Sequence, residues 1–220
     1  MPKDLLVRGF DDKIHSKLGD IAGKRGVSLN SIVKDAVDKW IENNAQTVKK
    51  HELVLYADDE ALKNFLKSLD RISQNDDFVK ACCGPKSHQG MEFLTKHGWL
   101  DGTVEPYKQF LENPNAYGKK VIQKIRSHIN AKQLMVIAFL TGDLAEKKSV
   151  SKSTDFCQWY HKQNVSGITH CVTHAENILS ENLTDVLNLF ETHDQVYIVK
   201  KDSINKIHVT RESIHKLLLN

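Results

Sequence analysis

The first forty-odd residues constrain this chain most, because a single short strand pattern is followed at once by two amphipathic helix patterns. A lone strand leaves its backbone N–H and C=O groups unpaired along both edges, and no other strand pattern occurs before residue 52. We therefore expect the strand to pair with the same strand of a second copy, which makes the chain a homodimer. The expected elements are a strand over Asp4–Phe10, helices over Asp12–Lys24 and Ser28–Asn43, and a turn at Arg25-Gly26-Val27.

The net positive charge of the chain lies in the same segment. The 220 residues include 31 Lys and Arg and 28 Asp and Glu, a formal excess of +3. Residues 1–50 hold ten of the basic and seven of the acidic side chains. The charges of the remaining 21 basic and 21 acidic side chains cancel. A mild positive balance on a small module fits a phosphate-facing surface, although it is also ordinary in a Lys-rich protein.

The residue types in this segment follow a specific order. The run Leu5-Leu6-Val7-Arg8-Gly9-Phe10-Asp11-Asp12 leads into periodic apolar residues and then Gly26-Val27-Ser28-Leu29-Asn30. Over residues 3–45 this order resembles the ribbon-helix-helix superfamily of DNA-binding proteins, which includes Arc and MetJ. The resemblance implies an intertwined dimer that lays a two-stranded ribbon in the major groove of double-stranded DNA. The family's strand usually ends in an apolar residue and a proline, whereas this chain has Gly9 and Phe10.

The resemblance also assigns DNA contacts. Strand alternation places Asp4, Leu6 and Arg8 on one face, where they would contact a cytosine amino group, a thymine methyl and a guanine edge. The free N–H groups that begin the second helix would bind a phosphate. A solvated Arg8 and a helix that is merely well capped are the structural alternatives. The candidate phosphate contacts are Lys3, Lys24, Arg25, Ser28, Leu29 and Asn30.

The chain is too long for this module alone, so we expect two domains. Residues 1–45 would bind DNA and dimerise, the polar residues 46–50 would form a linker, and residues 51–220 would form a second domain. We predict an α+β fold class, with a mainly helical second domain and one small antiparallel sheet. The sheet strands are expected at 52–56, 195–200 and 206–209, helices at 78–83 and 132–140, and a loop at 142–154.

The second domain also contains the residue types that bind transition metals. Cys157 and His161 are four residues apart, so a helix would place both on one face, and His170, Cys171 and His174 follow. Thiolate and imidazole ligands suit zinc, nickel or copper. These five residues are the candidate ligands of a transition metal, and the sequence indicates no other cofactor. Chance proximity among eleven histidines is the alternative.

Evidence for catalysis is weaker. Cys82 and Cys83 precede His88, which places thiols near a base, but no third residue is positioned to orient that histidine. Glycines are isolated, so no phosphate-cradling loop is present. We therefore do not expect an enzyme.

The leading expectation is a sequence-specific transcriptional regulator, such as a repressor, that binds double-stranded DNA as a homodimer. Its second domain would respond to a small molecule, metal or protein effector, or would build a higher oligomer. An antitoxin or interaction scaffold is the alternative, and an enzyme dimerised by the first module is a weaker one. The start Met1-Pro2-Lys3-Asp4 does not resemble a signal peptide, and no apolar run is long enough to cross a bilayer. We expect a cytoplasmic protein with no membrane partner and no disulfide framework.

Overall fold

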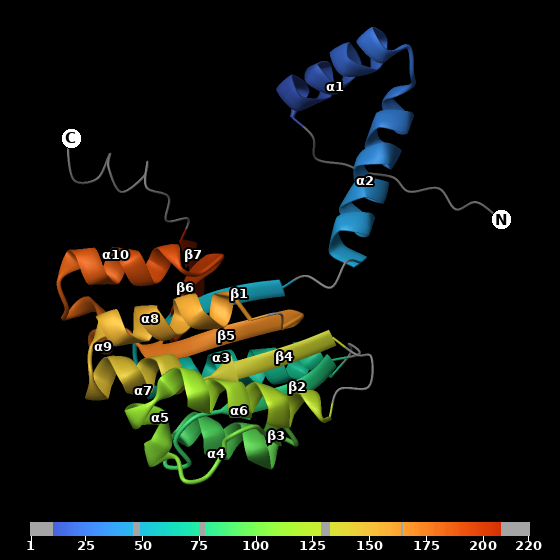
Figure 1. The fold of residues 1–220 in the computed structure, drawn as a ribbon. Helices are drawn as coiled ribbons and strands as arrows, with labels where there is room; N and C mark the ends of the chain where they lie inside the picture. The colour runs from blue at the N-terminus through green and yellow to red at the C-terminus, as the bar shows by residue number, and fades with distance from the viewer. Residues whose placement is uncertain (1–10, 46–48, 75–77, 129–132, 164, 208–220) are drawn as a thin grey trace. The chain divides into compact units, whose positions relative to one another are not determined.

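The computed structural model describes residues 11–45, 49–74, 78–128, 133–163 and 165–207, and the backbone alone for 38–45. The chain divides into two compact units, residues 1–47 and 48–220 (Figure 1). The predicted linker at 46–50 lies across this division, and Lys49 and Lys50 already belong to the first strand of the larger unit.

The smaller unit contains two helices, α1 (Asp12–Arg25) and α2 (Leu29–Ala45). The Asp11 carboxylate caps α1 by accepting a hydrogen bond from the Ile14 N–H at 2.7 Å. Gly26 ends α1 in the left-handed region, at φ 64°, where a residue without Cβ is favoured. The hydroxyl of Ser28 accepts from the Ser31 N–H at 3.1 Å and caps the start of α2. The two predicted helices and the turn between them are confirmed, whereas the predicted strand lies outside the described residues.

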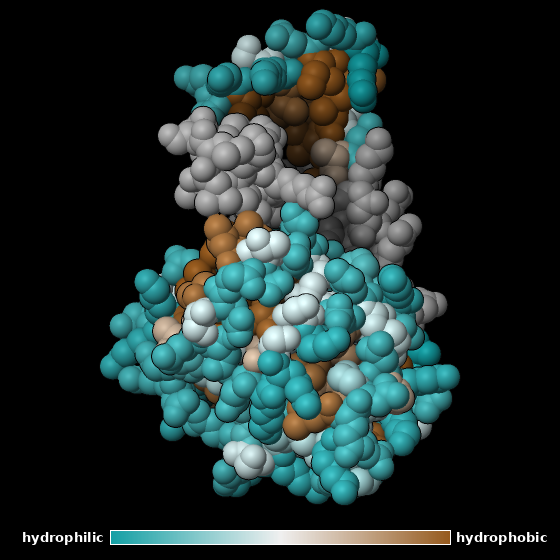
Figure 2. All heavy atoms as spheres, turned by 60° about the vertical axis from the view of Figure 1, so that its left-hand side comes forward, coloured by the Kyte–Doolittle hydropathy of each residue, from teal (hydrophilic) through white to brown (hydrophobic). Residues whose placement is uncertain are grey.

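The α1–α2 pair has an apolar area on its surface. Figure 2 shows it in brown between hydrophilic side chains, and the exposed residues include Ile14, Ile21 and Val27. Leu18, Ile32 and Val33 are half-buried, and Ala22 is the buried residue of α1. The amphipathic pattern of both helices is therefore real, but such a pattern is common to helix pairs of many kinds.

The assignment of the chain to the ribbon-helix-helix superfamily was wrong, and so was the description of the chain as a ribbon-helix-helix DNA-binding repressor homodimer, which depended on that assignment. Most of the chain forms a seven-stranded sheet with its covering helices, and the fold of that superfamily contains no such sheet. A glycine turn between two capped helices accounts for the part of the quoted pattern that the structure describes, and such turns occur in many folds. The predicted base contacts Asp4, Leu6 and Arg8, together with Lys3, lie outside the described residues.

The larger unit forms one sheet in the order β3-β2-β4-β5-β1-β6-β7. Every neighbouring pair is parallel except β6 and β7, which form an antiparallel hairpin. The strands are β1 (Lys49–Tyr56), β2 (Phe78–Cys83), β3 (Leu100–Asp101), β4 (Gln133–Ala138), β5 (Gly167–His174), β6 (Gln195–Lys200) and β7 (Ser203–Ile207).

Helices cover both faces of this sheet and create two cores (Figure 1). Leu53 and Leu55 of β1 enter the first core, whereas Val54 and Tyr56 enter the second, as strand alternation requires. None of the helices in the described ranges is both long and apolar enough to cross a membrane. The second core is covered by α3 (Asp59–Ser73) and α4 (Gln89–Lys96), and the first by α5 (Lys108–Glu112), α6 (Pro114–Arg126), α7 (Leu140–Lys147), α8 (Val150–His161), α9 (Glu176–Leu179) and α10 (Leu183–Glu191).

The predicted fold class was wrong, because the larger unit is an α/β fold and not a mainly helical α+β domain. The helices predicted at 78–83 and 132–140 are the strands β2 and β4. Strands buried on both faces read as short, continuous apolar runs, which lack the alternation that identifies a strand.

Two further predictions for this unit have separate outcomes. The prediction of a small antiparallel sheet was wrong, because β1 pairs with β6 in parallel, with Glu52 opposite Gln195. The loop predicted at 142–154 contains parts of α7 and α8. The antiparallel pairing of the strands predicted at 195–200 and 206–209 is confirmed, although β7 begins at Ser203.

Candidate metal centre

Four buried side chains in the larger unit bring their ligand atoms together. One ligand atom from each of His51, Cys157, Cys171 and His193 lies within 4.8 Å of the other three. Two imidazoles and two thiols form the Cys₂His₂ ligand set of structural zinc sites. Zinc–ligand bond lengths place tetrahedral ligand atoms roughly 3.3 to 3.8 Å apart. Small inward movements of these side chains would therefore place all four on one ion.

Two neighbouring strands supply the first half of the group. In the register of β1 and β5, His51 lies opposite Thr169 and Leu53 lies opposite Cys171. His51 and Cys171 are therefore two positions apart along the sheet and project from the same face. The Nε2 atom of His51 lies 3.1 Å from the Sγ atom of Cys171.

The second half comes from helices on that face. Cys157 lies on α8, and its sulfur is 3.5 Å from the hydroxyl oxygen of Thr141. His193 follows the end of α10, and its ring centroid is 4.2 Å from that of His51. A reciprocal contact fixes this turn, because Asp194 donates its N–H to the His51 carbonyl and accepts the His51 N–H on its carboxylate, both at 2.7 Å.

The protonation of His193 is suited to metal binding. Its Nδ1 atom lies 2.8 Å from the carbonyl oxygen of Leu189, which only accepts, so Nδ1 carries the proton. Its buried Nε2 atom has no nitrogen or oxygen partner in the described part of the chain and interacts with the Cys171 sulfur. Burial lowers the pKa of His193, which favours the neutral ring that metals bind. Metal-bound histidines typically donate their other N–H to a carbonyl or carboxylate, as His193 does.

The two thiols differ in their ease of ionisation. A hydrogen bond from the Cys157 thiol, opposed by burial and assisted by His51, holds the pKa of Cys171 well below its usual value. Burial raises the pKa of Cys157, and the nearby Cys171 sulfur raises it further. Cys171 therefore loses its proton readily, whereas Cys157 keeps its own. A bound cation would favour release of the Cys157 proton as well.

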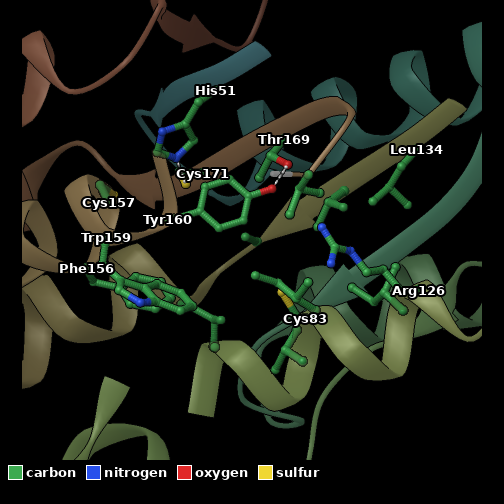
Figure 3. A pocket seen from close by; sticks show the side chains of 18 residues that line it. His51, Cys83, Arg126, Leu134, Phe156, Cys157, Trp159, Tyr160, Thr169 and Cys171 are labelled. Carbon is green, nitrogen blue, oxygen red and sulfur yellow. Dashed lines mark hydrogen bonds between the residues drawn. The ribbon is translucent and has the colours of Figure 1, made fainter. Parts of the chain in front are cut away.

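The group borders an enclosed, mostly apolar space. A cavity of about 40 Å³ lies beside His51, Cys157 and Cys171 (Figure 3). Tyr160 closes one side, where its hydroxyl lies 2.6 Å from that of Thr169. Apolar surroundings exclude water and strengthen the attraction between thiolates and a cation.

Of the five metal ligands predicted from the sequence, the structure brings together Cys157 and Cys171. His161 is exposed and outside the group, although its ring centroid is 6.3 Å from that of His51. His170 projects from the opposite face of β5, where its Nδ1 atom lies 2.9 Å from the Glu52 carboxylate. His174 ends the same strand on that opposite face. Sequence reasoning missed His51 and His193, which are far from the cysteines along the chain.

A signal for one of these histidines was available. His51 stands in alternation with Leu53 and Leu55, so it shares the face of β1 that enters the first core. A histidine at a core-facing strand position needs a polar partner or a metal. His193 gave no comparable signal, because it follows a helix at a turn.

The structure describes some of the other candidate residues named in the sequence analysis. Burial raises the pKa of Cys82 to about 12, and Cys83 is also buried, so neither is a reactive thiol. His88 stacks on Phe139 at 4.1 Å, away from any thiol in the described contacts. In the smaller unit, the predicted phosphate contacts that are described lie around the turn between the helices; they are Lys24, Arg25, Ser28, Asn30 and the half-buried Leu29.

The fold and the ligand group together define a mostly parallel α/β domain with a buried Cys₂His₂ cluster. No protein-family model matches the chain, and no curated protein matches it. Among solved structures, the chain is similar to a protein from Pyrococcus horikoshii OT3 that is described only as the subject of a structural study. The two are 11% identical, the match covers 78% of this chain and 93% of that one, and the TM-score is 0.47. A likeness at this level carries no argument about function.

Proposed function

We propose that the larger unit is a zinc-binding α/β domain, in which the ion has a structural role. The observation that supports this proposal is the convergence of four ligand atoms, two sulfurs and two nitrogens, within 4.8 Å of one another. Four protein ligands complete a tetrahedral shell and leave no open position for a substrate or an activated water. All four side chains are buried, which also favours a structural ion over a catalytic one.

Such an ion would join segments that are far apart in the chain. His51 lies on β1, Cys157 on α8 and Cys171 on β5, and His193 follows α10. Because the unfolded chain has no preformed site, the free energy of zinc binding adds directly to the free energy of folding. The ion would therefore act as a cross-link between the sheet and the helices that cover it.

The donor atoms select the class of metal. Thiolate sulfur and imidazole nitrogen bind zinc and other soft or borderline ions, whereas magnesium and calcium require oxygen ligands. The tetrahedral Cys₂His₂ set favours zinc among the first-row ions. Cobalt(II) would occupy the same ligands and report them spectroscopically.

Metal analysis of the purified full chain tests the proposal. We expect one zinc per chain, lost on exposure to a strong chelator with a fall in melting temperature. Cobalt reconstitution should produce thiolate-to-metal charge-transfer absorption. The variant Cys157→Ser should lose both signals, whereas Cys82→Ser, which changes a buried cysteine outside the group, should keep them. A metal-free protein that neither takes up zinc nor gains stability from it would overturn the proposal.

A role in transcription stays a prediction. The residues that would read DNA bases, Asp4, Leu6 and Arg8, lie outside the described part of the chain. A metal is one of the effectors predicted for such a regulator. The buried group supports only this metal-binding part of the prediction.

A further inference from the structure

A second potential site lies away from the metal group, at the carboxyl ends of the parallel strands. A cleft of about 340 Å³ opens beside Tyr56 at the end of β1, Phe139 after β4, and His174 at the end of β5. The helix that follows β1 covers one face of the sheet, whereas the helices that follow β5 cover the other. Adjacent strands whose connections diverge in this way form the crevice in which open α/β sheets usually bind ligands.

Two histidines in this cleft have their protons fixed by the backbone. The Nδ1 atom of His88 accepts the N–H of Gly90 at 3.1 Å, and that of His174 accepts the N–H of Glu176 at 3.2 Å. A neutral imidazole that accepts at Nδ1 carries its proton at Nε2. Both rings are therefore hydrogen-bond donors through Nε2.

This protonation is the reverse of that in His193. A metal-binding imidazole presents a lone pair and donates its other N–H, as His193 does to Leu189. His88 and His174 instead present an N–H at Nε2, so the cleft suits an organic acceptor better than a metal ion.

The Tyr56 hydroxyl takes over the donor role of His88. The Nε2 atom of His88 lies 3.5 Å from the Tyr56 hydroxyl oxygen, which can accept its proton and leave the Tyr56 O–H free to donate. Burial, followed by the nearby Asp59 and Glu146, raises the pKa of Tyr56 to about 12, so the hydroxyl keeps its proton at neutral pH. The ring of His174 meets that of Tyr56 edge to face at 5.1 Å, which places the donors side by side.

The charged residues of the cleft are acidic. Asp143, Glu146 and Glu176 line it, and no Lys or Arg side chain does so among the described residues. Asp143 is engaged, because its carboxylate pairs with Lys147 at 2.7 Å and accepts the Tyr107 hydroxyl at 3.0 Å. Glu146 and Glu176 are exposed and can accept hydrogen bonds from a ligand. An acidic rim without cations disfavours phosphate and other anions.

We infer that this cleft binds a small organic molecule that carries no phosphate, is neutral or cationic, and contains both hydroxyl or amino groups and oxygen or ring-nitrogen acceptors. The acceptors lie against the Tyr56 hydroxyl, which His88 orients, and the His174 imidazole, and the hydroxyl or amino groups donate to Glu146 and Glu176. Phe139 and Val172 supply the apolar part of the wall.

Matched ligand pairs test this inference on the full, zinc-loaded chain. The probes are adenosine with adenosine monophosphate, and glucosamine with glucosamine 6-phosphate. Binding is followed through the imidazole carbon–proton NMR signals of His88 and His174. We expect at least one unphosphorylated probe to shift both signals, with an affinity at least tenfold higher than its phosphorylated partner. No shift with any probe, or tighter binding of the phosphorylated members, would overturn the inference.

Two variants then locate the binding. Tyr56→Phe removes one hydroxyl, and His174→Ala removes one donor at a partly exposed position, so both should fold with unchanged zinc content. Each should lower the affinity for the bound probe at least fivefold. The variant His97→Ala, which changes an exposed histidine at the opposite end of α4 from His88, should leave the affinity unchanged. Wild-type affinity in both cleft variants would place the ligand elsewhere and refute the inference. Zinc content is measured separately, so failure here is distinguishable from failure of the metal proposal.

Discussion

His193 donates its Nδ1 proton to the carbonyl oxygen of Leu189, one helical turn earlier, over 2.8 Å. This hydrogen bond leaves the lone pair of Nε2 available to a metal before any ion is present, and Nε2 already interacts with the Cys171 sulfur. The helix end that carries both residues therefore sets the protonation of the ligand as well as its position.

The first prediction concerns this histidine. We expect His193→Ala to lower zinc affinity by at least about 100-fold, because a ligand and its fixed lone pair are both removed. His161→Ala is the matched control, since His161 is exposed and outside the group, and it should bind zinc like the wild type. Competition with a colorimetric chelator measures both. Equal zinc affinity in the two variants would contradict the ligand assignment.

The second prediction separates neighbours in β5. His170→Ala should lower the free energy of unfolding by about 1–3 kcal/mol, because the buried Glu52 carboxylate loses its partner at 2.9 Å. Zinc content should stay at one per chain, since His170 faces the opposite core from Cys171. Urea denaturation and metal analysis of one preparation give both values. Loss of zinc from folded His170→Ala protein would contradict the assigned faces.

The third prediction is a pH dependence. Burial alone would raise the pKa of Asp70, but hydrogen bonds from Trp99 at 2.9 Å and Lys80 at 3.0 Å outweigh it and lower that pKa below 3.8. The Asp70 carboxylate therefore binds a proton more readily in the unfolded chain than in the folded one. The ionised carboxylate stabilises the fold above about pH 3.8, and this stabilisation is lost as the pH falls through the pKa of folded Asp70.

We expect Asp70→Asn to cost about 1–3 kcal/mol of unfolding free energy at pH 7, with the difference from wild type shrinking toward pH 2. Urea unfolding across this range is the measurement. Glu92→Gln is a control, because the Glu92–Lys96 pair is exposed and should contribute little. A difference for Asp70→Asn that grows as the pH falls would show that the sign is wrong.

The fourth prediction concerns thiol reactivity. Burial, with a smaller effect of Asp101, raises the pKa of Cys82 to about 12, and burial raises that of Cys83 well above its ordinary value. At pH 8 the thiolate fraction of Cys82 is on the order of 10⁻⁴. Iodoacetamide followed by mass spectrometry should therefore leave both residues unlabelled in native protein and label them in denaturant. Rapid native labelling of Cys83 would revive the reactive-thiol hypothesis.

The fifth prediction compares two glycines. Gly167 begins β5 at φ 121°, and a Cβ there would overlap the Leu134 carbonyl oxygen of the neighbouring strand. We expect Gly167→Ala to cost about 3 kcal/mol or more, because strain and steric overlap combine. Gly98 also has a positive φ, 80°, but lies in open space, so Gly98→Ala should cost about 1–2 kcal/mol. Thermal unfolding should rank the two variants in this order.

Local patterns predicted the elements that have local causes. The helices expected over Asp12–Lys24 and Ser28–Asn43 and the glycine turn at Gly26 are set by residues close in sequence, and the structure confirms them. The strands β2 and β4 were read as helices, because a parallel strand buried on both faces has no polar alternation. Because β3 and β5 were not predicted as strands either, a helical domain was expected in place of a seven-stranded sheet.

Two of the four residues of the metal group, Cys157 and Cys171, were predicted from the sequence, and the other two were missed. Cys157 and Cys171 lie close in sequence to several histidines, so the local composition was enough to predict them as metal ligands. The choice among their neighbours required the strand assignment, since alternation places His170 and His174 on the opposite face from Cys171. His51 and His193 join the group only through long-range pairing of β1 with β5 and the contact between Asp194 and His51.

The alternation of β5 also limits how this protein can change in length. Cys171 faces one core while His170 and His174 face the other, so the strand serves the metal group and the cleft at once. Insertion or deletion of one residue within β5 would exchange these roles, and both sites would be lost together. A change of two residues would restore the faces. Variation in the length of this strand among related chains should therefore occur in steps of two residues.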